Sequence, residues 1–376
     1  MSEQKLVGYD IEPPAEAGPA QRVDVDSLRD VVSQIMEAAG YPSDRAALVA
    51  DSLVHADMRG VASHGVTRAR IYSKRAKAGL VDPRAVPTVS GGTRAGRRLD
   101  ASNAPGQVAA EAAVQEAIKG ARDLGVCVVG VVNSNHCGTL AYFLEKITAA
   151  GLVGLAATNG PAVMAYFGSR ARAVGTNPLG YGIPRSDGPP IILDMATSNA
   201  ARGKIIAMAR SGEGEVPDGW AIDTEGRPTT DPVAALAGAV LPFGGPKGSG
   251  LAMGIEFLCG TLLSGITGPA VGDMYEHWDR TQQVGHIFFA LDPECWSSAE
   301  IFDSNVRRFV QEIHNLPPAA GADRVYLPGE IEDAAAEDAA KNGVLLSGAV
   351  IADLRALATE AGVSRKLETV GETMVT

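Results

Sequence analysis

The sequence lacks the features that mark membrane-spanning, secreted and disulfide-stabilised proteins. No apolar run reaches the roughly 20 residues that cross a bilayer, and the polar, proline-rich start contains no signal-peptide core. Only four cysteines occur, and their spacing forms neither a CxxC pair nor a zinc or disulfide pattern. These absences predict a cytoplasmic protein with reduced thiols and no membrane partner.

Positive charge is also scarce. The chain carries 33 Lys and Arg against 44 Asp and Glu, a net charge of −11. This balance argues against nucleic acid as a partner, because nucleic-acid binding calls for clustered cations. With 45% hydrophobic residues, 44 glycines and 22 prolines, the composition is that of a globular protein with many tight turns. A chain of 376 residues usually forms two domains.

No GxGxxG motif follows a predicted strand, so a Rossmann fingerprint is missing. The most glycine-dense stretch, FGGPKGSG at 243–250, precedes an apolar helix predicted over 251–263. It is not a Walker motif, because Lys247 lies between Pro246 and Gly248. Two interpretations stay open for this loop: its N–H groups and Lys247 hold a phosphate, or it is a tight packing turn.

The segment 55–72, HADMRGVASHGVTRARIY, concentrates groups that can do chemistry. The pattern predicts one helix capped by Ser43 that stops near Gly60, and a second from about Ser63 to residue 79. His64 would then lie in a first helical turn, on the same face as Arg68. A histidine beside a fork-shaped carboxylate binder is typical of a substrate site. The alternative is a serine cap, a surface histidine and a solvated arginine.

The middle of the chain predicts an α/β unit. A hairpin over 81–99 precedes a helix from Pro105 to Gly125, an apolar strand over 126–132, a polar loop, a helix to Gly151 and a strand over 152–157. Strand, loop, helix and strand outline a crossover unit, whose ligands lie at carboxyl ends of strands. His136 falls at such an end. Its alternative role is a buried histidine bonded to the loop.

The next segments place an acidic side chain at another strand end. We expect an irregular loop at 175–184 (GTNPLGYGIP), a strand over 191–194, and a helix that is capped by Ser198 and carries Arg202 and Lys204. Asp194 at the strand end can accept hydrogen bonds from a ribose, or it can cap nearby backbone. Both interpretations stay open.

Helical patterns dominate the two ends of the chain. They predict an amphipathic helix from Asp26 to Gly40, one opened by Ser298, an acidic helix after 326–330, a strand over 344–346 and a last helix led by Ser347. The expected fold is mixed α/β. A flexible arm (1–22) precedes a mainly helical domain (23–82 and 297–376), and an α/β cofactor-binding domain occupies 83–296.

Together these motifs, in this order, resemble the malate/L-lactate dehydrogenase type 2 family, which includes sulfolactate, ureidoglycolate and 2,3-diketogulonate enzymes and a cyclic-imine reductase. The resemblance spans the chain from about residue 25. It implies a nicotinamide cofactor on a non-Rossmann fold, a small carboxylate substrate, homodimers and no metal. The motifs that carry it are ADMRGVASHGVTR, NSNHCG, GTNPLGYGIP, LDMATSNAARGK, GGPKGSGLA and LPGE.

The resemblance also implies residue roles. His64 is similar to the proton donor, Ser63 to its orienting hydroxyl, and Arg68 to the ligand of the substrate carboxylate. Tyr72 is a further predicted substrate ligand, and His136 a cofactor contact with a part in acid–base catalysis. The predicted cofactor-binding positions are His136, Cys137, Gly138, Thr139, Leu140, Thr176, Asp194, Met195, Ala196, Arg202, Gly203, Lys247 and Gly248.

Three positions depart from the family pattern. Ala62 stands where an acidic residue precedes Ser-His-Gly, and Pro246 where His or Tyr is usual. Lys204 occupies a position that is Asp in the imine-reductase branch, where that Asp completes a Ser-His-Asp relay. The missing acid disfavours imine reduction and favours the hydroxy-acid branch.

The expected reaction is hydride transfer between NAD or NADP and a 2-hydroxy acid, with the acid and its chirality left open. Alternatives are an epimerase that retains NAD and oxidises its substrate transiently, a cyclic-imine reductase, and a non-catalytic cofactor-binding protein. NAD is favoured over NADP, because an acidic side chain at the ribose repels the extra phosphate. The acidic candidates are Asp194, Glu330 and Glu332; the basic exceptions are Arg202 and Lys204.

Overall fold

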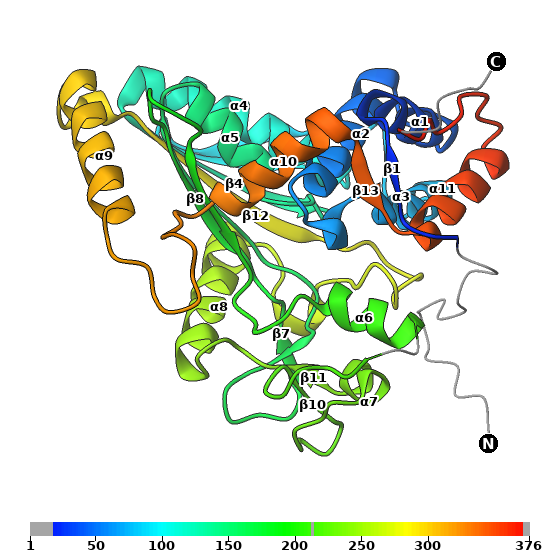
Figure 1. The fold of residues 1–376 in the computed structure, drawn as a ribbon. Helices are drawn as coiled ribbons and strands as arrows, with labels where there is room; N and C mark the ends of the chain where they lie inside the picture. The colour runs from blue at the N-terminus through cyan, green and yellow to red at the C-terminus, as the bar shows by residue number, and fades with distance from the viewer. Residues whose placement is uncertain (1–17, 212–213, 371–376) are drawn as a thin grey trace.

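The computed structural model describes residues 18–211 and 214–370. Most of the predicted arm, residues 1–17, lies outside the described residues, as do residues 371–376. The end of that arm is not loose. Strand β1 (Gln21–Val23) pairs antiparallel with β13 (Val344–Leu346), so the two ends of the chain meet in one small sheet (Figure 1). The arm prediction was therefore wrong for residues 21 and 22.

A seven-stranded sheet forms the centre of the molecule (Figure 1). The strand order is β2-β3-β4-β12-β5-β8-β9. The strands are β2 (Thr88–Gly92), β3 (Gly96–Asp100), β4 (Val126–Ser134), β5 (Val153–Thr158), β8 (Leu179–Ile183), β9 (Ile191–Met195) and β12 (Val284–Leu291). As expected for a crossover unit, β4 and β5 run in the same direction. They are not neighbours, because β12 lies between them and runs antiparallel to both. This insertion distinguishes the sheet from a parallel Rossmann sheet and confirms the expected mixed α/β class.

Helices cover both faces of this sheet. Because side chains alternate along β12, Phe288 and Ala290 pack against α4 (Gly106–Leu124) and α5 (Ala141–Ala149). Ile287 faces the opposite side, toward α8 (Pro246–Cys259). Helix α4 begins after Pro105 and ends at Gly125, whose φ of +83° is the left-handed conformation of a helix terminator.

The helical layer joins the two ends of the chain. Four helices share one core with the β1–β13 pair. They are α1 (Val25–Ala38), α2 (Ser43–Met58), α3 (Ala69–Lys77) and α11 (Gly348–Glu360). Asp24 caps α1 through the backbone N–H of Ser27, and Ser347 caps α11. Ser43 does not cap α2. It is the first helical residue, and Pro42 holds the cap position without a side-chain bond.

A second lobe carries a four-stranded sheet with its own core (Figure 1). It contains β6 (Met164–Ala165), β7 (Arg172–Val174), β10 (Ala221–Ile222), β11 (Ala239–Val240), α6 (Arg202–Ser211) and α7 (Pro232–Ala237). The short helices η3 (Thr261–Leu263), η4 (Gly268–Ala270) and η5 (Pro293–Cys295) lie in the connections. The chain then continues through α9 (Ala299–His314) and the acidic helix α10 (Glu330–Asn342).

Three local predictions were wrong for physical reasons. The expected loop at 175–184 contains strand β8, whose glycines let α5 pack closely: a Cβ on Gly182 would meet Thr148 Cγ2 at 2.8 Å. Helix α8 starts at Pro246, so Lys247 and Gly248 belong to its first turn. Ser198 does not cap α6, because its hydroxyl donates to the Ala200 carbonyl at 2.7 Å.

The predicted domain boundaries stay predictions. Residues from both ends of the chain share the core of the helical layer, and α9 lies apart from it at the far edge of the sheet (Figure 1). Val310 of α9 packs with Ile191 and Leu327.

No helix among the described residues is long and apolar enough to cross a membrane. All four cysteines are free thiols, and the cytoplasmic location stays a prediction.

Candidate active site

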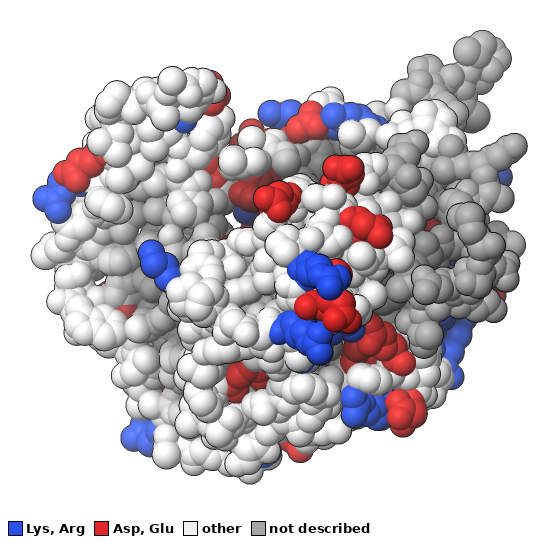
Figure 2. All heavy atoms as spheres, turned by 90° about the horizontal axis from the view of Figure 1, so that it is seen from below, with Lys and Arg blue, Asp and Glu red and all other residues white. Residues whose placement is uncertain are grey.

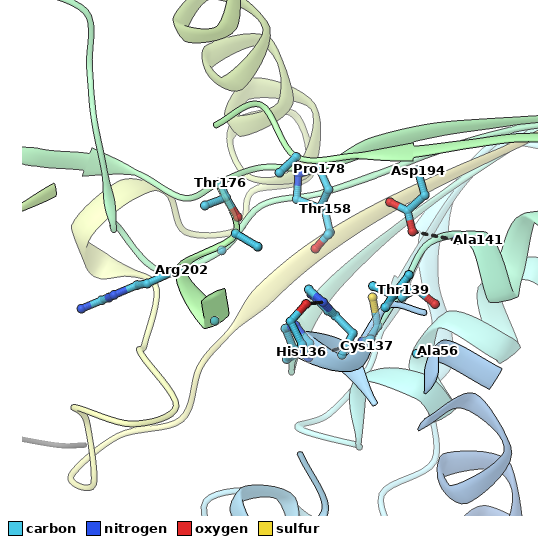
Figure 3. Close-up of a pocket in the computed structure, with 18 of the residues that line it drawn as sticks. Ala56, His136, Cys137, Thr139, Ala141, Thr158, Thr176, Pro178, Asp194 and Arg202 are labelled. Atoms are coloured by element: carbon cyan, nitrogen blue, oxygen red, sulfur yellow. Dashed lines mark hydrogen bonds between the residues drawn. The ribbon is translucent and has the colours of Figure 1, made fainter. Parts of the chain in front are cut away.

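One cavity of about 650 Å³ lies where the central sheet, the helical layer and the second lobe meet. Strands β4, β5 and β9 run in the same direction, and their carboxyl ends open into it. Figure 3 shows side chains from these ends around the opening. The predicted site residues that line the cavity are Ser63, His64, Arg68, His136, Cys137, Gly138, Thr139, Thr176, Asp194, Ala196, Arg202 and Gly203.

The Ser-His-Gly segment reaches the cavity through two short 3-10 helices, η1 (Ala62–His64) and η2 (Val66–Arg68). The predicted helix start at Ser63 was wrong, because α3 begins only at Ala69. The Asp57 carboxylate accepts the Val66 N–H at 2.6 Å and packs directly on Gly65, where any Cβ would overlap it. Asp57 therefore sets the turn between the two short helices, and burial raises its pKa to about 7.

His64 is held by its neighbour. The Ser63 Oγ lies 2.9 Å from Nδ1 of His64, which leaves Nε2 as the nitrogen for proton exchange. Burial, and next the positive charge of Arg68, lower the pKa of His64 to about 3. The imidazole is therefore neutral. The amino end of α3 does not cause the lowered pKa of His64, because His64 lies outside that helix.

Arg68 is buried beside His64, and two of its nitrogens already have protein partners. Its Nε donates to the Ser63 carbonyl at 2.8 Å, and its Nη1 donates to the Tyr275 hydroxyl. The guanidinium carbon also lies 5.6 Å from the centre of the Tyr275 ring. Tyr275 and Met274 line the cavity but escaped the sequence motifs, because they come from a distant loop.

His136 stacks near His64, with ring centres 5.4 Å apart and planes at 25°. The Gly138 N–H, which can only donate, lies 3.3 Å from Nδ1 of His136, and the Tyr72 hydroxyl lies 2.6 Å from it. Nδ1 is therefore an acceptor and Nε2 carries the proton. Burial, and next His64 and Arg68, lower the pKa of His136 well below its usual value.

A third histidine, His286 on β12, lies fully buried behind this pair. Its Nδ1 is 2.8 Å from the Thr158 hydroxyl and its Nε2 is 2.9 Å from the Ser134 hydroxyl. These bonds join the ends of three central strands. Burial lowers the pKa of His286 to about 4, so the ring is neutral. A single histidine in an apolar strand is no motif, so His286 could not be identified from the sequence.

Asp194 reaches the amino end of α5, where its Oδ2 accepts the Ala141 N–H at 3.0 Å (Figure 3). Capping of backbone, one of the two open interpretations, is therefore observed. Burial raises the pKa of Asp194, and the N–H groups of Ala141 and Leu140 oppose that shift. Burial also raises the pKa of Cys137 to about 12, so its thiol is not a nucleophile at neutral pH.

Two buried polar atoms of cavity residues make no hydrogen bond within the described part of the chain. They are Thr139 Oγ1 and Asn177 Oδ1. A polar ligand in the cavity would satisfy them, as would an ordered water. Together with the Asp194 carboxylate they form the donor and acceptor set that ribose hydroxyls and amides require. The residues present therefore fit a nicotinamide dinucleotide.

The first turn of α6 borders the histidine side of the cavity. Arg202 pairs with Glu276 at 3.1 Å and Asp273 at 3.5 Å. Gly203 lies against Ser63, since a Cβ there would be 3.1 Å from the serine Cβ. Lys204 is exposed at the rim, with its ammonium 6.0 Å from the centre of the Trp220 ring.

Five predicted site residues do not line the cavity. Tyr72 lies behind His136, and Leu140 is buried in the core. Met195 follows Asp194 on β9, so alternation turns it to the other face. Lys247 is exposed, and Gly248 packs against the Phe243 and Thr197 carbonyls, where a Cβ would not fit. The close packing of Gly248 favours the packing-turn interpretation of the glycine-rich loop. Substrate contact by Tyr72 and cofactor contact by the other four residues stay predictions.

Two buried ionic groups support the walls and were missed in the sequence. Arg59 lines the cavity and binds Asp333 of α10 at 2.6 Å and Glu145 of α5 at 3.1 Å. Glu256 of α8 accepts hydrogen bonds from the side-chain amides of Asn159, which follows β5, and Asn177, which precedes β8; both asparagines line the cavity. Their partners lie far apart in sequence, so no local motif marks them. Within residues 18–211 and 214–370, no cluster of three or more His, Cys, Asp or Glu could hold a metal ion.

Comparison with known proteins places this geometry in a family. A family model for malate/L-lactate dehydrogenase matches residues 23–355. Ureidoglycolate dehydrogenase (NAD(+)) from Escherichia coli O157:H7 is 35% identical over 323 residues, covering 86% of this chain and 92% of that protein. (2R)-3-sulfolactate dehydrogenase (NADP(+)) from Chromohalobacter salexigens is 37% identical over 264 residues, covering 70% and 78%.

A solved structure agrees over nearly the whole chain. Sulfolactate dehydrogenase from Methanocaldococcus jannaschii superposes with a TM-score of 0.83 at 32% identity, covering 91% of this chain and 98% of that one. The sequence resemblance to this family is thus confirmed. The chain belongs to the malate/L-lactate dehydrogenase family and is a dehydrogenase of 2-hydroxy acids.

Proposed function

We propose that this protein interconverts a 2-hydroxy acid and the 2-oxo acid, with His64 as the acid–base group and Arg68 as the carboxylate ligand. One observation carries the proposal: a neutral imidazole and a buried guanidinium share the wall of a cavity whose other walls offer polar groups to a dinucleotide. The nicotinamide cofactor supplies the hydride acceptor or donor when bound. The protein supplies alignment, charge and the proton.

His64 is suited to move the hydroxyl proton. Its Nδ1 is occupied by Ser63, so Nε2 takes the proton when the alcohol is oxidised and returns it when the ketone is reduced. The nearby charge of Arg68 weakens the free base. A bound substrate carboxylate offsets this charge, which raises the pKa of His64 when proton transfer is needed.

Arg68 is held in place before substrate arrives. Ser63 fixes its Nε, and Nη1 donates to Tyr275 and, at 3.9 Å, to the Met274 sulfur. A substrate carboxylate can bind Nη2 and replace the weak sulfur acceptor on Nη1, which gives a two-point contact. Preorganisation lowers the entropy cost of binding. The cavity thus recognises the carboxylate that all 2-hydroxy acids share, and the identity of the acid depends on the other walls.

The cofactor proposed for this chain is NAD. The carboxylates of Asp194 and Glu332 line the cavity. Of the basic side chains, Arg59 and Arg202 already bind carboxylates, and Lys204 lies at the rim beside Trp220. We expect NAD to bind at least about tenfold more tightly than NADP, a difference of roughly 1.4 kcal/mol. Calorimetric titration with both oxidised cofactors checks this. A smaller Kd for NADP would show that a cation faces the ribose phosphate.

Purified protein incubated with NAD and a panel of 2-hydroxy acids tests the function directly. We expect reduced-nicotinamide absorbance to appear with a subset of the acids and to be absent with the matching 2-hydroxy amides, which Arg68 cannot bind as anions. The absence of cofactor reduction with every acid, under conditions where calorimetry shows NAD bound, would overturn the proposal.

The cyclic-imine alternative finds no support around His64. Lys204, at the position of the relay acid, is exposed and lies over Trp220. The partner of His64 Nδ1 is the Ser63 hydroxyl. The pKa of His64 is lowered by burial and by Arg68, and no acidic side chain is among the causes of its shift. An epimerase that retains NAD would use the same His64 and Arg68 groups. An isotope label on the C2 hydrogen of the substrate distinguishes such an epimerase from a dehydrogenase.

We also propose that the protein is a homodimer, as the family resemblance implies. Helix α8 exposes large apolar side chains, among them Phe257 at 54%, and η3 adds Leu262 at 66%. Figure 2 shows few charged side chains on the left of the lower face, the side on which α8 lies. Such a patch is typical of a protein interface.

Sedimentation equilibrium should give a mass near twice the 38.8 kDa of the chain. Phe257→Asp should lower that mass to the monomer, because a charge then has to be buried in the interface. The matched control is Val86→Asp, at a similarly exposed apolar residue in the loop before β2. A monomer for the unmodified chain would contradict the dimer.

A further inference from the structure

A second, very small cavity lies behind His136, on the side away from the large one. It joins the helical layer to the start of α4, and its volume is about 10 Å³. That volume is close to the least that holds one water molecule. The lining residues that matter are Tyr72, Arg75, Gln107 and Asn135.

Three of these residues each have a buried polar atom that makes no well-formed hydrogen bond within the described part of the chain. The atoms are Nε of Arg75, Nε2 of Gln107 and Oδ1 of Asn135. All three residues are at most 3% exposed. A buried polar group without a partner costs about 1–3 kcal/mol, so three around one cavity are not expected by chance. They comprise two donors and one acceptor.

The composition of this set decides the occupant. An anion would satisfy the Arg75 and Gln107 donors but face the lone pairs of the Asn135 oxygen, and a cation would have the opposite conflict. A water molecule accepts from both donors and donates to Asn135, with one proton left over. We propose that the cavity binds one structural water between Arg75, Gln107, Asn135 and Tyr72, and that Gln107 acts through it as a positioning residue for His136.

The remaining water proton points to the Tyr72 oxygen. The Tyr72 hydroxyl has a single hydrogen, which goes to Nδ1 of His136 because the Gly138 N–H shows that this nitrogen accepts. The Tyr72 oxygen is then free to accept from the water. Gln107 faces the same oxygen, since its amide opposes the rise in the pKa of Tyr72 that burial causes. This chain of bonds holds the Tyr72 hydroxyl on Nδ1 of His136 and so fixes the orientation of the ring.

Arg75 gives the water a fixed support. Its other nitrogens donate to the carbonyls of Met274 at 3.2 Å, His277 at 2.8 Å and Arg280 at 3.1 Å, so the guanidinium cannot turn away. The same bonds hold the loop that brings Tyr275 to Arg68. The water therefore connects the support of His136 with the support of the carboxylate ligand. The kinetic consequence rests on the proposed function; the water and the tautomer do not.

The test compares the unmodified protein with Gln107→Leu, which keeps the side-chain volume and removes the donor. A high-resolution crystal structure should show one ordered water in the unmodified cavity and none in the variant. Nitrogen-15 NMR of His136 should show the Nε2–H tautomer in both proteins, because the Gly138 N–H remains. The Nδ1 resonance should shift in Gln107→Leu, because the Tyr72 hydroxyl that donates to it is no longer held by the water. We expect kcat to fall about tenfold in the variant, with the Kd of the cofactor unchanged.

The matched control is Gln115→Leu, two turns further along α4, where the amide is exposed and donates only to Glu111. It should match the unmodified protein in every readout. A dry cavity, or an ion in it, in the unmodified crystal overturns the water site. Loss of the water with an unchanged Nδ1 resonance of His136 overturns the positioning role. Because crystals and NMR need no turnover, an inactive enzyme would contradict the proposed function without touching this inference.

Discussion

Replacement of His64 by alanine is expected to lower kcat by about 10²- to 10⁴-fold, the usual contribution of a positioned acid–base group. No other group replaces it: Nδ1 of His136 accepts hydrogen bonds from Tyr72 and Gly138, and burial keeps that ring neutral. Steady-state kinetics with the best acid of the panel measures the effect. Cofactor affinity should stay within about threefold, because His64 is one lining residue among many.

The fold should survive this change. The turn that carries His64 is held by Asp57 and Val66, and the His64 side chain lines the open cavity, so alanine leaves no sealed void in the core. His314→Ala is the control, since that histidine binds Glu330 on the surface at 2.8 Å. Equal kcat for a folded His64→Ala protein and the unmodified one would remove His64 from the mechanism.

Arg68→Lys is expected to reduce kcat/KM for carboxylate substrates by about 10²-fold. Arginine contacts Ser63, Tyr275 and the substrate at once, and a lysine ammonium cannot reproduce this planar arrangement. Loss of one charged hydrogen bond costs roughly 1.5–3 kcal/mol, which converts to this range. Kinetics at varied substrate concentration should place most of the loss in KM, since ground-state binding of the carboxylate is what is weakened.

Arg70→Lys provides the matched control two residues further along the same segment. Arg70 binds Asp353 and Glu360 of α11, away from the cavity, so its replacement should leave kcat/KM unchanged. Identical kinetics for Arg68→Lys and Arg70→Lys would mean that Arg68 does not contact the substrate.

Elements with strong local signals could be predicted from the sequence. The cap and stop residues Pro105 and Gly125 bound α4 as expected, and Ser298 and Ser347 cap α9 and α11. The apolar runs became the buried strands β4 and β5. In these segments the pattern along the chain and the packing in three dimensions favour the same conformation.

Predictions failed where a distant side chain or backbone decides the conformation. The helix expected from Ser63 is interrupted because Asp57, on α2, binds the Val66 N–H and needs the space at Gly65. Strand β8 looked like a loop because its glycines are required by the close approach of α5, a contact invisible in a local pattern.

The candidate site also contains residues that local motifs identify and residues that only distant contacts bring into place. Ser63, His64, Arg68 and His136 lie in motifs and line the cavity. The residues that hold them come from elsewhere in the chain: Tyr275 binds Arg68, and His286 joins the strand ends behind His136. Single residues in a loop or a strand carry no signature of such long-range contacts, so only the folded structure reveals them.

The most direct test of the central claim follows the hydrogen on C2 of the substrate. The best 2-hydroxy acid of the panel, deuterated at C2, is incubated with the protein and NAD, and the released products are analysed by mass spectrometry. The account predicts deuterium in free reduced nicotinamide, in an amount equal to the 2-oxo acid formed. Deuterium returned to C2 of the inverted hydroxy acid, with no reduced cofactor released, would contradict the dehydrogenase and identify an epimerase.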